Sequence, residues 1–312
     1  MKDFLLKTLR KYYLVLAILV LVLTILALFA YDTSIISSIE KLYIKPYKGE
    51  VKIADYPILK TNNFSNISAT AAAVLDKNSG RLIFSKNGNI HFQPASTTKI
   101  ATAIVSLEYF KLTDILTVKS GPPEGVGIGL EKGERISFES LLYAMMLPSA
   151  NDAAAAVADN FPGGRKVFIE KMNLKAAELG LLNTHFEDPA GLDEGNFTTS
   201  TDLAKLALAV LDNEKIKEVV STKNKNITNE DGSKSYSLAN LNRLLGERGV
   251  NGVKTGYTEE AGQVLVVSKD EVISGKKRTT IVVIMKSTDR FGDMEKLLQG
   301  LSGNITYLSI RP

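Results

Sequence analysis

The most apolar part of the chain is the run of residues 14–30, in which Thr24 is the single polar side chain. Because such a run is long enough to cross a bilayer, residues 13–30 are predicted to form a transmembrane anchor. Residues 1–12 carry four cationic side chains and one acid, which places them in the cytoplasm and the rest of the chain outside the cell membrane. A cleaved signal peptide ending at Ala30 is the alternative, although Leu28 is large for a cleavage site.

Residues 31–66 have no hydrophobic period and contain Pro46 and Pro57, so they are predicted to be a membrane-proximal linker. Two short apolar runs, residues 71–75 and 82–85, then flank a polar turn at 76–80, which is the pattern of a β-hairpin. Helical periodicity follows over residues 96–110, 138–146, 151–159, 166–179 and 201–211. Strand-like runs return at 252–255, 263–268 and 279–285, before an amphipathic helix at 289–301.

Strands at both ends of residues 67–312 therefore enclose a helical middle. This order predicts an α/β domain in which one antiparallel sheet is built from both ends of the domain and a helical subdomain is inserted between them. The seam between the two parts is where a pocket is expected.

Charge and composition exclude several functions. The formal net charge is +4, and residues 1–12 supply +3 of it, so no basic surface for nucleic acid is indicated. The chain has no cysteine, and its two histidines, His91 and His185, are far apart in the sequence. A zinc site and a Ser-His-Asp triad are therefore poorly supported, and no metal or other cofactor is expected.

Ser96 is the strongest candidate nucleophile. Pro94 cannot continue a helix backwards, so Ser96 should lie at the start of the helix predicted from residue 96, with Lys99 one turn further on the same face. A hydroxyl with an amine at this spacing can act as a nucleophile with its own base. The alternative is a helix-capping serine with a solvated lysine. The same S-x-x-K pattern occurs at residues 38–41 and 274–277, but neither copy opens an apolar helix.

Two further motifs follow Ser96 in the chain. Ser149 and Asn151 lie at a break between helices, where the hydroxyl could relay a proton and the amide could hold a peptide group; helix capping is the alternative. Lys254, Thr255 and Gly256 begin the second block of strands. There an edge strand could bind an extended peptide while the lysine and threonine receive a carboxylate, and the alternative is a glycine turn with a solvated lysine.

The order of S-x-x-K, S-x-N and K-T-G resembles that of the serine β-lactamases and penicillin-binding proteins. Within this group residues 68–310 look like the D-alanyl-D-alanine carboxypeptidases, the low-molecular-mass penicillin-binding proteins of serine peptidase family S11. The resemblance extends to Pro94–Lys99, Leu147–Ala154, Asp188–Leu192, Ser200–Asp202 and Gly252–Thr258. Ala150 and Asn251 depart from the family pattern, where Gly and Asp are usual.

The resemblance implies a β-lactamase/penicillin-binding-protein fold and a serine hydrolase acting on peptidoglycan stem peptides that end in D-Ala-D-Ala. By this resemblance Ser96 attacks the carbonyl between the two D-alanines, and Lys99 accepts its proton. Ser149 passes that proton to the leaving D-alanine. β-Lactam antibiotics would acylate the same serine.

The resemblance also assigns the binding residues. Lys254 supplies positive potential, Thr255 binds the terminal carboxylate, Gly256 lets the substrate approach the strand, and Asn151 orients the peptide. The backbone N–H groups of Ser96 and Tyr257 would form the oxyanion hole.

Three other functions stay open at this stage. A β-lactamase shares the fold but needs a base for deacylation, for which Glu187 is the nearest candidate. A peptidoglycan DD-endopeptidase would cut cross-links, and a catalytically silent wall-binding module would keep the fold without the reaction.

Overall fold

The computed structural model describes residues 19–27, 55–61, 64, 66–121 and 125–308. The chain divides into two compact units, residues 1–52 and residues 53–312. In the first unit residues 19–27 are helical, and the rest of the predicted anchor at 13–30 lies outside the described residues, as do residues 1–12. Within the described ranges, no helix has both the length and the apolar character needed to cross a membrane.

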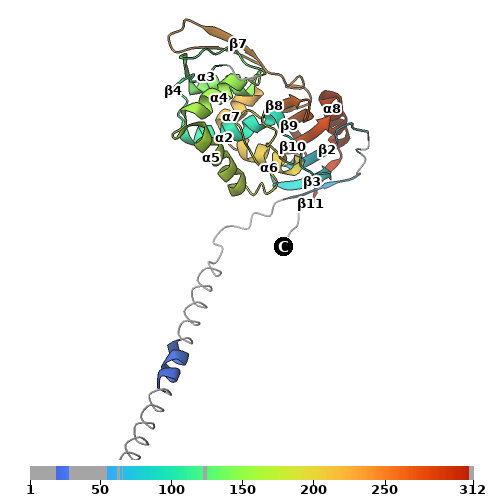
Figure 1. The fold of residues 1–312 in the computed structure, drawn as a ribbon. Helices are drawn as coiled ribbons and strands as arrows, with labels where there is room; N and C mark the ends of the chain where they lie inside the picture. Colours follow the sequence, from blue (N-terminus) through green and yellow to red (C-terminus); the bar gives the residue numbers. More distant parts are fainter. Residues whose placement is uncertain (1–18, 28–54, 62–63, 65, 122–124, 309–312) are drawn as a thin grey trace, which may run out of the picture. The chain divides into compact units, whose positions relative to one another are not determined.

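The second unit is built on a five-stranded antiparallel sheet (Figure 1). Its strands are β2 (Ala71–Asp76), β3 (Arg81–Lys86), β8 (Val250–Thr258), β9 (Gly262–Ile273) and β10 (Lys276–Ser287). They lie in the order β3-β2-β10-β9-β8, so the N-terminal hairpin pairs directly with the C-terminal strands. The predicted sheet from both ends of the domain is thereby confirmed, and β8 is one of its two edges.

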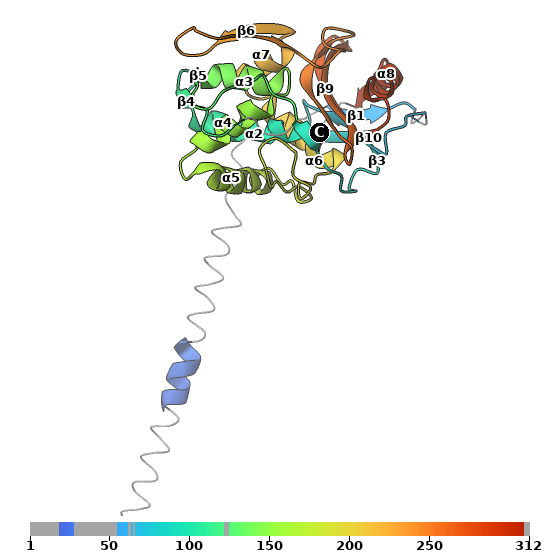
Figure 2. The same ribbon diagram turned by 45° about the horizontal axis from the view of Figure 1, so that its top comes forward.

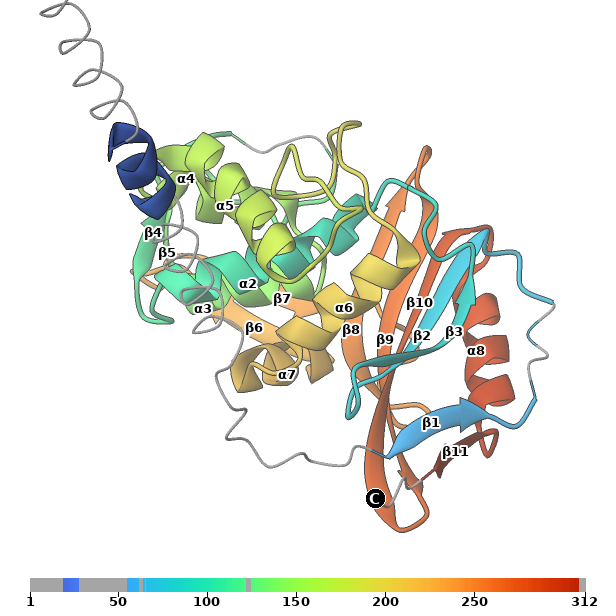
Figure 3. The ribbon, with the colours of Figure 1, turned by 90° about the horizontal axis from the view of Figure 1, so that it is seen from below.

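The helices between β3 and β8 form the inserted subdomain. A 3-10 turn, η1 (Ala95–Thr98), leads into α2 (Lys99–Tyr109), and α3 (Phe138–Met146), α4 (Asn151–Asn160), α5 (Gly164–Glu178), α6 (Ser200–Val210) and α7 (Glu214–Ser221) follow. The last helix, α8 (Arg290–Leu301), lies on the other face of the sheet from α2 and α6 (Figure 2, Figure 3). The predicted helices are therefore present, with their ends displaced by a few residues.

Both faces of the sheet are buried because alternate side chains pack into two different cores. Ala73, Val266 and Val283 belong to the larger core, shared with the inserted helices. Ala72, Val267 and Val282 belong to a smaller core, shared with α8. This explains why the three inner strands, β2, β9 and β10, each contain a continuous apolar run in the sequence rather than an alternating pattern.

The boundary predicted at residue 67 lies inside the folded unit. Strand β1 (Tyr56–Leu59), in the predicted linker, pairs antiparallel with the C-terminal strand β11 (Ile305–Leu308). Residues 53–66 therefore belong to the second unit. The sequence pattern did not indicate this strand because Pro57 interrupts it, and backbone pairing at a two-stranded edge tolerates a proline.

Some short elements were not predicted. These are α7 and two small hairpins, β4 (Ile115–Thr117) with β5 (Arg135–Ser137) and β6 (Asn224–Thr228) with β7 (Ser235–Ala239). Strand β6 buries one side chain, that of Ile227, and its other four are exposed. A strand with one buried position leaves no period-two signal in the sequence.

Candidate active site

Ser96 lies in the 3-10 turn η1 and Lys99 begins α2, so the predicted position at a helix start is confirmed. The Lys99 Nζ donates a hydrogen bond of 2.9 Å to the Ser96 Oγ. Neither η1 nor α2 has a side-chain cap. The capping serine with a solvated lysine, the alternative at this motif, is therefore not what the structure contains.

The amine of Lys99 is buried among polar groups from three elements. It donates to the Asn151 Oδ1 at 2.7 Å and to the Ala190 carbonyl oxygen at 2.9 Å, in addition to Ser96. Burial lowers the pKa of Lys99 to about 7, while the nearby carboxylates of Asp188 and Asp152 act in the opposite direction. At neutral pH a substantial fraction of this amine is uncharged and able to take a proton.

The S-x-N motif is brought to the same place. Asn151 is the first residue of α4, and its side chain contacts Lys99 instead of capping the helix. Ser149 is buried, and among the described residues its Oγ has no hydrogen-bond partner. A buried hydroxyl without a partner is uncommon and is available to a bound molecule.

Lys254, Thr255 and Gly256 lie on the edge strand β8, beside η1. An added Cβ at Gly256 would lie 3.2 Å from the Ser96 backbone nitrogen, so the strand passes directly next to the nucleophile turn. Lys254 is buried and donates to the Thr255 carbonyl oxygen at 3.0 Å. Burial, then the positive charges of Lys99 and Arg290, hold the pKa of Lys254 well below its usual value. Tyr257, one residue further along, is exposed.

Arg290 is a site residue that the sequence reasoning missed. It begins α8, and its Nη1 donates to the Gly256 carbonyl oxygen at 2.9 Å. Burial and the neighbouring Arg243 lower the pKa of this half-buried guanidinium. No local pattern marks Arg290, because its proximity to Lys254 depends on how α8 packs against the sheet.

Two residues at the site have backbone conformations that side chains rarely adopt. The φ angle is 47° at Ala95, directly before the nucleophile, and 69° at Ser149. Non-glycine residues in this region cost on the order of 1–3 kcal/mol each and cluster at functional sites. The strain is thus located in the two segments whose side chains, those of Ser96 and Asn151, accept from the Lys99 amine.

Other polar residues lie elsewhere. His185 pairs with Glu187 at 2.7 Å, and His91 pairs with Asn183 at 3.1 Å. Among the described residues, no group of three or more histidines and carboxylates is placed to hold a metal ion. Glu187 is half-exposed, and its partner is the similarly exposed His185.

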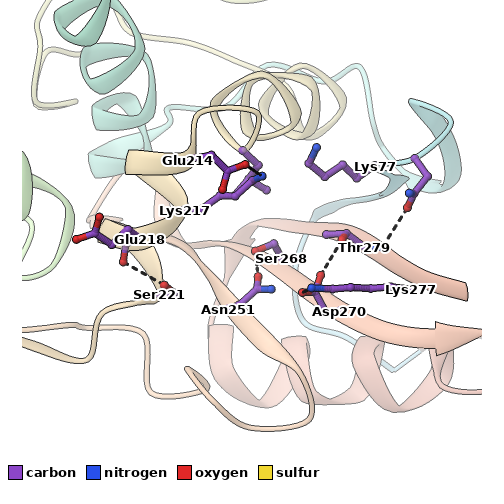
Figure 4. A pocket seen from close by; sticks show the side chains of 12 residues that line it. Lys77, Glu214, Lys217, Glu218, Ser221, Asn251, Ser268, Asp270, Lys277 and Thr279 are labelled. Carbon is purple, nitrogen blue, oxygen red and sulfur yellow. Dashed lines mark hydrogen bonds and ion pairs between the residues drawn. The ribbon is translucent and has the colours of Figure 1, made fainter.

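A cavity of about 730 Å³ lies between α7 and the sheet, and none of the predicted site residues lines it (Figure 4). Several of its polar side chains pair with one another. Asp270 accepts from Thr279 at 2.6 Å and pairs with Lys277 at 2.8 Å, and Ser268 bonds to Asn251. Since these groups already have hydrogen-bond or ion-pair partners, Ser96 is better supported than this cavity as the place of a reaction.

Residues 58–288 match the family model described as D-alanyl-D-alanine carboxypeptidase. The chain belongs to this family. It is 35% identical over 241 residues to the carboxypeptidase DacF of Bacillus subtilis, covering 74% of this chain and 61% of that protein. It is 31% identical over 207 residues to a D-alanyl-D-alanine endopeptidase of Pseudomonas aeruginosa, covering 64% of this chain and 67% of that protein. The chain thus spans less than two thirds of the length of DacF.

Solved structures agree with the fold. The Streptomyces K15 DD-transpeptidase superposes with a TM-score of 0.67 at 30% identity, covering 76% of this chain and 98% of that one. A penicillin-binding protein homologue from Mycobacterium tuberculosis gives a TM-score of 0.73 at 26% identity, covering 80% of this chain and 97% of that one. The predicted penicillin-binding-protein fold is confirmed.

Proposed function

We propose that this protein is a serine-type carboxypeptidase that removes the terminal D-alanine from peptidoglycan stem peptides ending in D-Ala-D-Ala. The observation that carries the proposal is the Lys99 amine, buried and with a pKa of about 7, at 2.9 Å from the Ser96 hydroxyl. Family membership supplies the substrate class, and this contact supplies a base for the nucleophile.

In the proposed reaction the neutral Lys99 amine takes the proton of Ser96 as its Oγ attacks the carbonyl carbon between the two D-alanines. The C–N bond then breaks, and the buried Ser149 hydroxyl relays the proton from Lys99 to the leaving D-alanine nitrogen. Backbone N–H groups of Ser96 and Tyr257 would stabilise the oxyanion. Water then attacks the acyl-serine ester, releasing the shortened peptide and restoring Ser96.

The positive residues behind Ser96 support recognition of a free terminal carboxylate. Arg290 lies close enough to Lys254 to lower its pKa. Neither residue forms an ion pair with a carboxylate in the part of the chain that the structure describes. An anionic substrate group would pair with Arg290 and favour the charged form of Lys254, with the Thr255 hydroxyl as a further donor. Such recognition requires a chain end, which favours a carboxypeptidase.

Mass analysis of the products from defined muropeptides tests the proposal. The full-length chain in detergent should release free D-alanine from a pentapeptide stem, and Ser96→Ala should release none. Cleavage of a cross-linked dimer with no release from the pentapeptide would instead identify an endopeptidase, the activity named for the Pseudomonas aeruginosa relative.

The β-lactamase alternative depends on rapid deacylation. Glu187, the candidate base, is bonded to His185 at the surface, so a bulky penicilloyl ester should be hydrolysed slowly. We expect a chromogenic cephalosporin to give one stoichiometric burst followed by very slow turnover. Sustained turnover as fast as that of a D-Ala-D-Ala peptide would establish a β-lactamase. Absence of any adduct with a fluorescent penicillin would indicate the silent wall-binding module.

Action outside the cytoplasm fits the cell-wall substrate, and we further propose that residues 13–30 tether the protein to the cell membrane. The support is the apolar run at 14–30 and the cationic flank before it. Protease added to intact spheroplasts should digest the catalytic unit. Protection until the membrane is broken would contradict this topology.

A further inference from the structure

The loop between α5 and α6 turns around a single carboxylate, that of Asp188. Its Oδ1 accepts from the backbone nitrogens of Gly191 at 2.9 Å, Leu192 at 3.1 Å and Asp193 at 3.4 Å. Two more donors, the Ala190 nitrogen at 3.1 Å and the Asn196 Nδ2 at 2.6 Å, complete the set. The Asp188 side chain thus holds residues 190–193 and Asn196 together in a segment that has no regular secondary structure.

This loop is seated on the nucleophile turn and on α2. The Ala190 carbonyl accepts from the Lys99 Nζ at 2.9 Å, and the Pro189 carbonyl accepts from the Thr102 Oγ1 at 2.6 Å. At Gly191, where φ is +87°, an added Cβ would lie 1.9 Å from the Ala95 carbonyl oxygen. The loop backbone is therefore in direct contact with the residue before Ser96, and any change in its path moves an acceptor of the Lys99 amine.

Three charged groups face Lys99, each from a different element. Asp188 comes from the loop, Asp152 from α4 and Lys254 from β8. The two carboxylates raise the pKa of Lys99 against the effect of burial, and Asp188 contributes the larger part. Asp152 holds another segment, since its Oδ2 accepts from the nitrogens of Ile128, Gly129 and Leu130 at 3.0 to 3.1 Å.

We propose that Asp188 is a positioning residue for Lys99. Its carboxylate folds the turn that carries the Ala190 carbonyl to the Lys99 amine, and its negative charge faces that amine from the same turn. The inference rests on the proposed function, in which Lys99 is the base. Asp188 contributes in two ways. Its hydrogen bonds set where the Lys99 amine lies, and its charge sets at which pH that amine loses its proton.

Two substitutions separate these contributions. Asp188→Asn removes the charge but keeps a side-chain oxygen for the turn, whereas Asp188→Ala removes every acceptor. Asp193→Asn is the matched control in the same loop, because the Asp193 carboxylate accepts from Gly195 at 2.8 Å and is exposed. The measurement is the rate of adduct formation with a fluorescent penicillin, recorded against pH for the full-length chain.

We expect Asp188→Asn to shift the acid limb of the acylation profile to lower pH by about half a unit or more, because loss of a nearby negative charge disfavours the ammonium form. Its rate on the high-pH plateau should stay within about 3-fold of the wild-type rate, since the turn keeps an acceptor. Asp188→Ala should lower the plateau by about 10-fold or more, because a displaced base is a poor one. Asp193→Asn should reproduce the wild-type profile.

The inference is overturned if the acid limb of Asp188→Asn coincides with those of the wild type and Asp193→Asn. An unchanged plateau in Asp188→Ala would equally overturn the positioning role. Should Asp188→Ala fail to fold, as judged by its circular dichroism melting curve, the acid limb of Asp188→Asn decides alone. A wild-type protein that forms no adduct refutes the proposed function itself, whereas normal wild-type acylation with unchanged variants refutes only the role of Asp188.

Discussion

The surroundings of Lys99 and of Lys254 differ although both lysines are buried within one site. Lys99 donates to three oxygen acceptors and faces two carboxylates, and its pKa falls to about 7. Among the described residues Lys254 donates to one acceptor, the carbonyl oxygen of Thr255. Burial, then the positive charges of Lys99 and Arg290, hold its pKa well below the usual value. The difference indicates that the Lys99 amine can exchange a proton near neutral pH, whereas the charged form of Lys254 would be favoured by a bound anion.

The largest expected effect is that of removing the Ser96 hydroxyl, which accepts a hydrogen bond from Lys99. Ser96→Ala should abolish the covalent penicillin adduct completely, because no other hydroxyl accepts a hydrogen bond from Lys99 among the described residues. Intact-mass analysis after incubation with penicillin measures this. An adduct of full stoichiometry in the variant would move the nucleophile to another residue and remove the basis for comparing the two lysines.

Removal of the base should be nearly as severe. Lys99→Ala should slow acylation by about 10²–10⁴-fold, the usual contribution of a general base. Stopped-flow fluorescence with a labelled penicillin gives the rate. Lys205→Ala, at a surface lysine that pairs with Asp202, provides the control and should acylate normally. A rate for Lys99→Ala within a few-fold of wild type would contradict the assignment of Lys99 as the base.

The contrast between the two lysines predicts that a substitution near Lys254 affects mainly substrate binding. Arg290→Gln should raise the KM for a D-Ala-D-Ala peptide about 10-fold, with a smaller change in kcat, because an attraction to the terminal carboxylate is lost. The same peptide with a C-terminal amide should be a poor substrate of the wild type, and Arg290→Gln should change its turnover little. Equal losses for the acid and the amide would show that Arg290 does not sense the carboxylate.

The smallest effect is the change in the acylation rate between pH 7 and pH 8, which follows from the titration of Lys99. The pKa of this buried amine is lowered from 10.5 to about 7, and the neutral form is the base, so acylation should rise with pH and reach half its plateau near pH 7. Between pH 7 and pH 8 the rate should therefore change by less than about 2-fold. A flat profile from pH 5.5 to pH 9 would show that Lys99 does not set the rate.

Local elements and motifs could be predicted because they are written in short stretches of sequence. The hairpin of β2 and β3 follows from two apolar runs around a polar turn, and α3 follows from continuous helical periodicity over residues 138–146. The position of Ser96 at a helix start follows from Pro94 before it and the apolar run after it. In each case burial within a single element determines the pattern.

The strand at 56–59, the carbonyl of Ala190 at Lys99 and the position of Arg290 beside Lys254 were decided only by the tertiary structure. Each depends on packing between segments distant in the chain, which leaves no period in either one. The sequence by itself determined which residues could carry the chemistry, because hydroxyl, amine and amide groups have fixed capabilities. The fold decided their charge states, because a pKa responds to burial and to neighbours that only packing brings together.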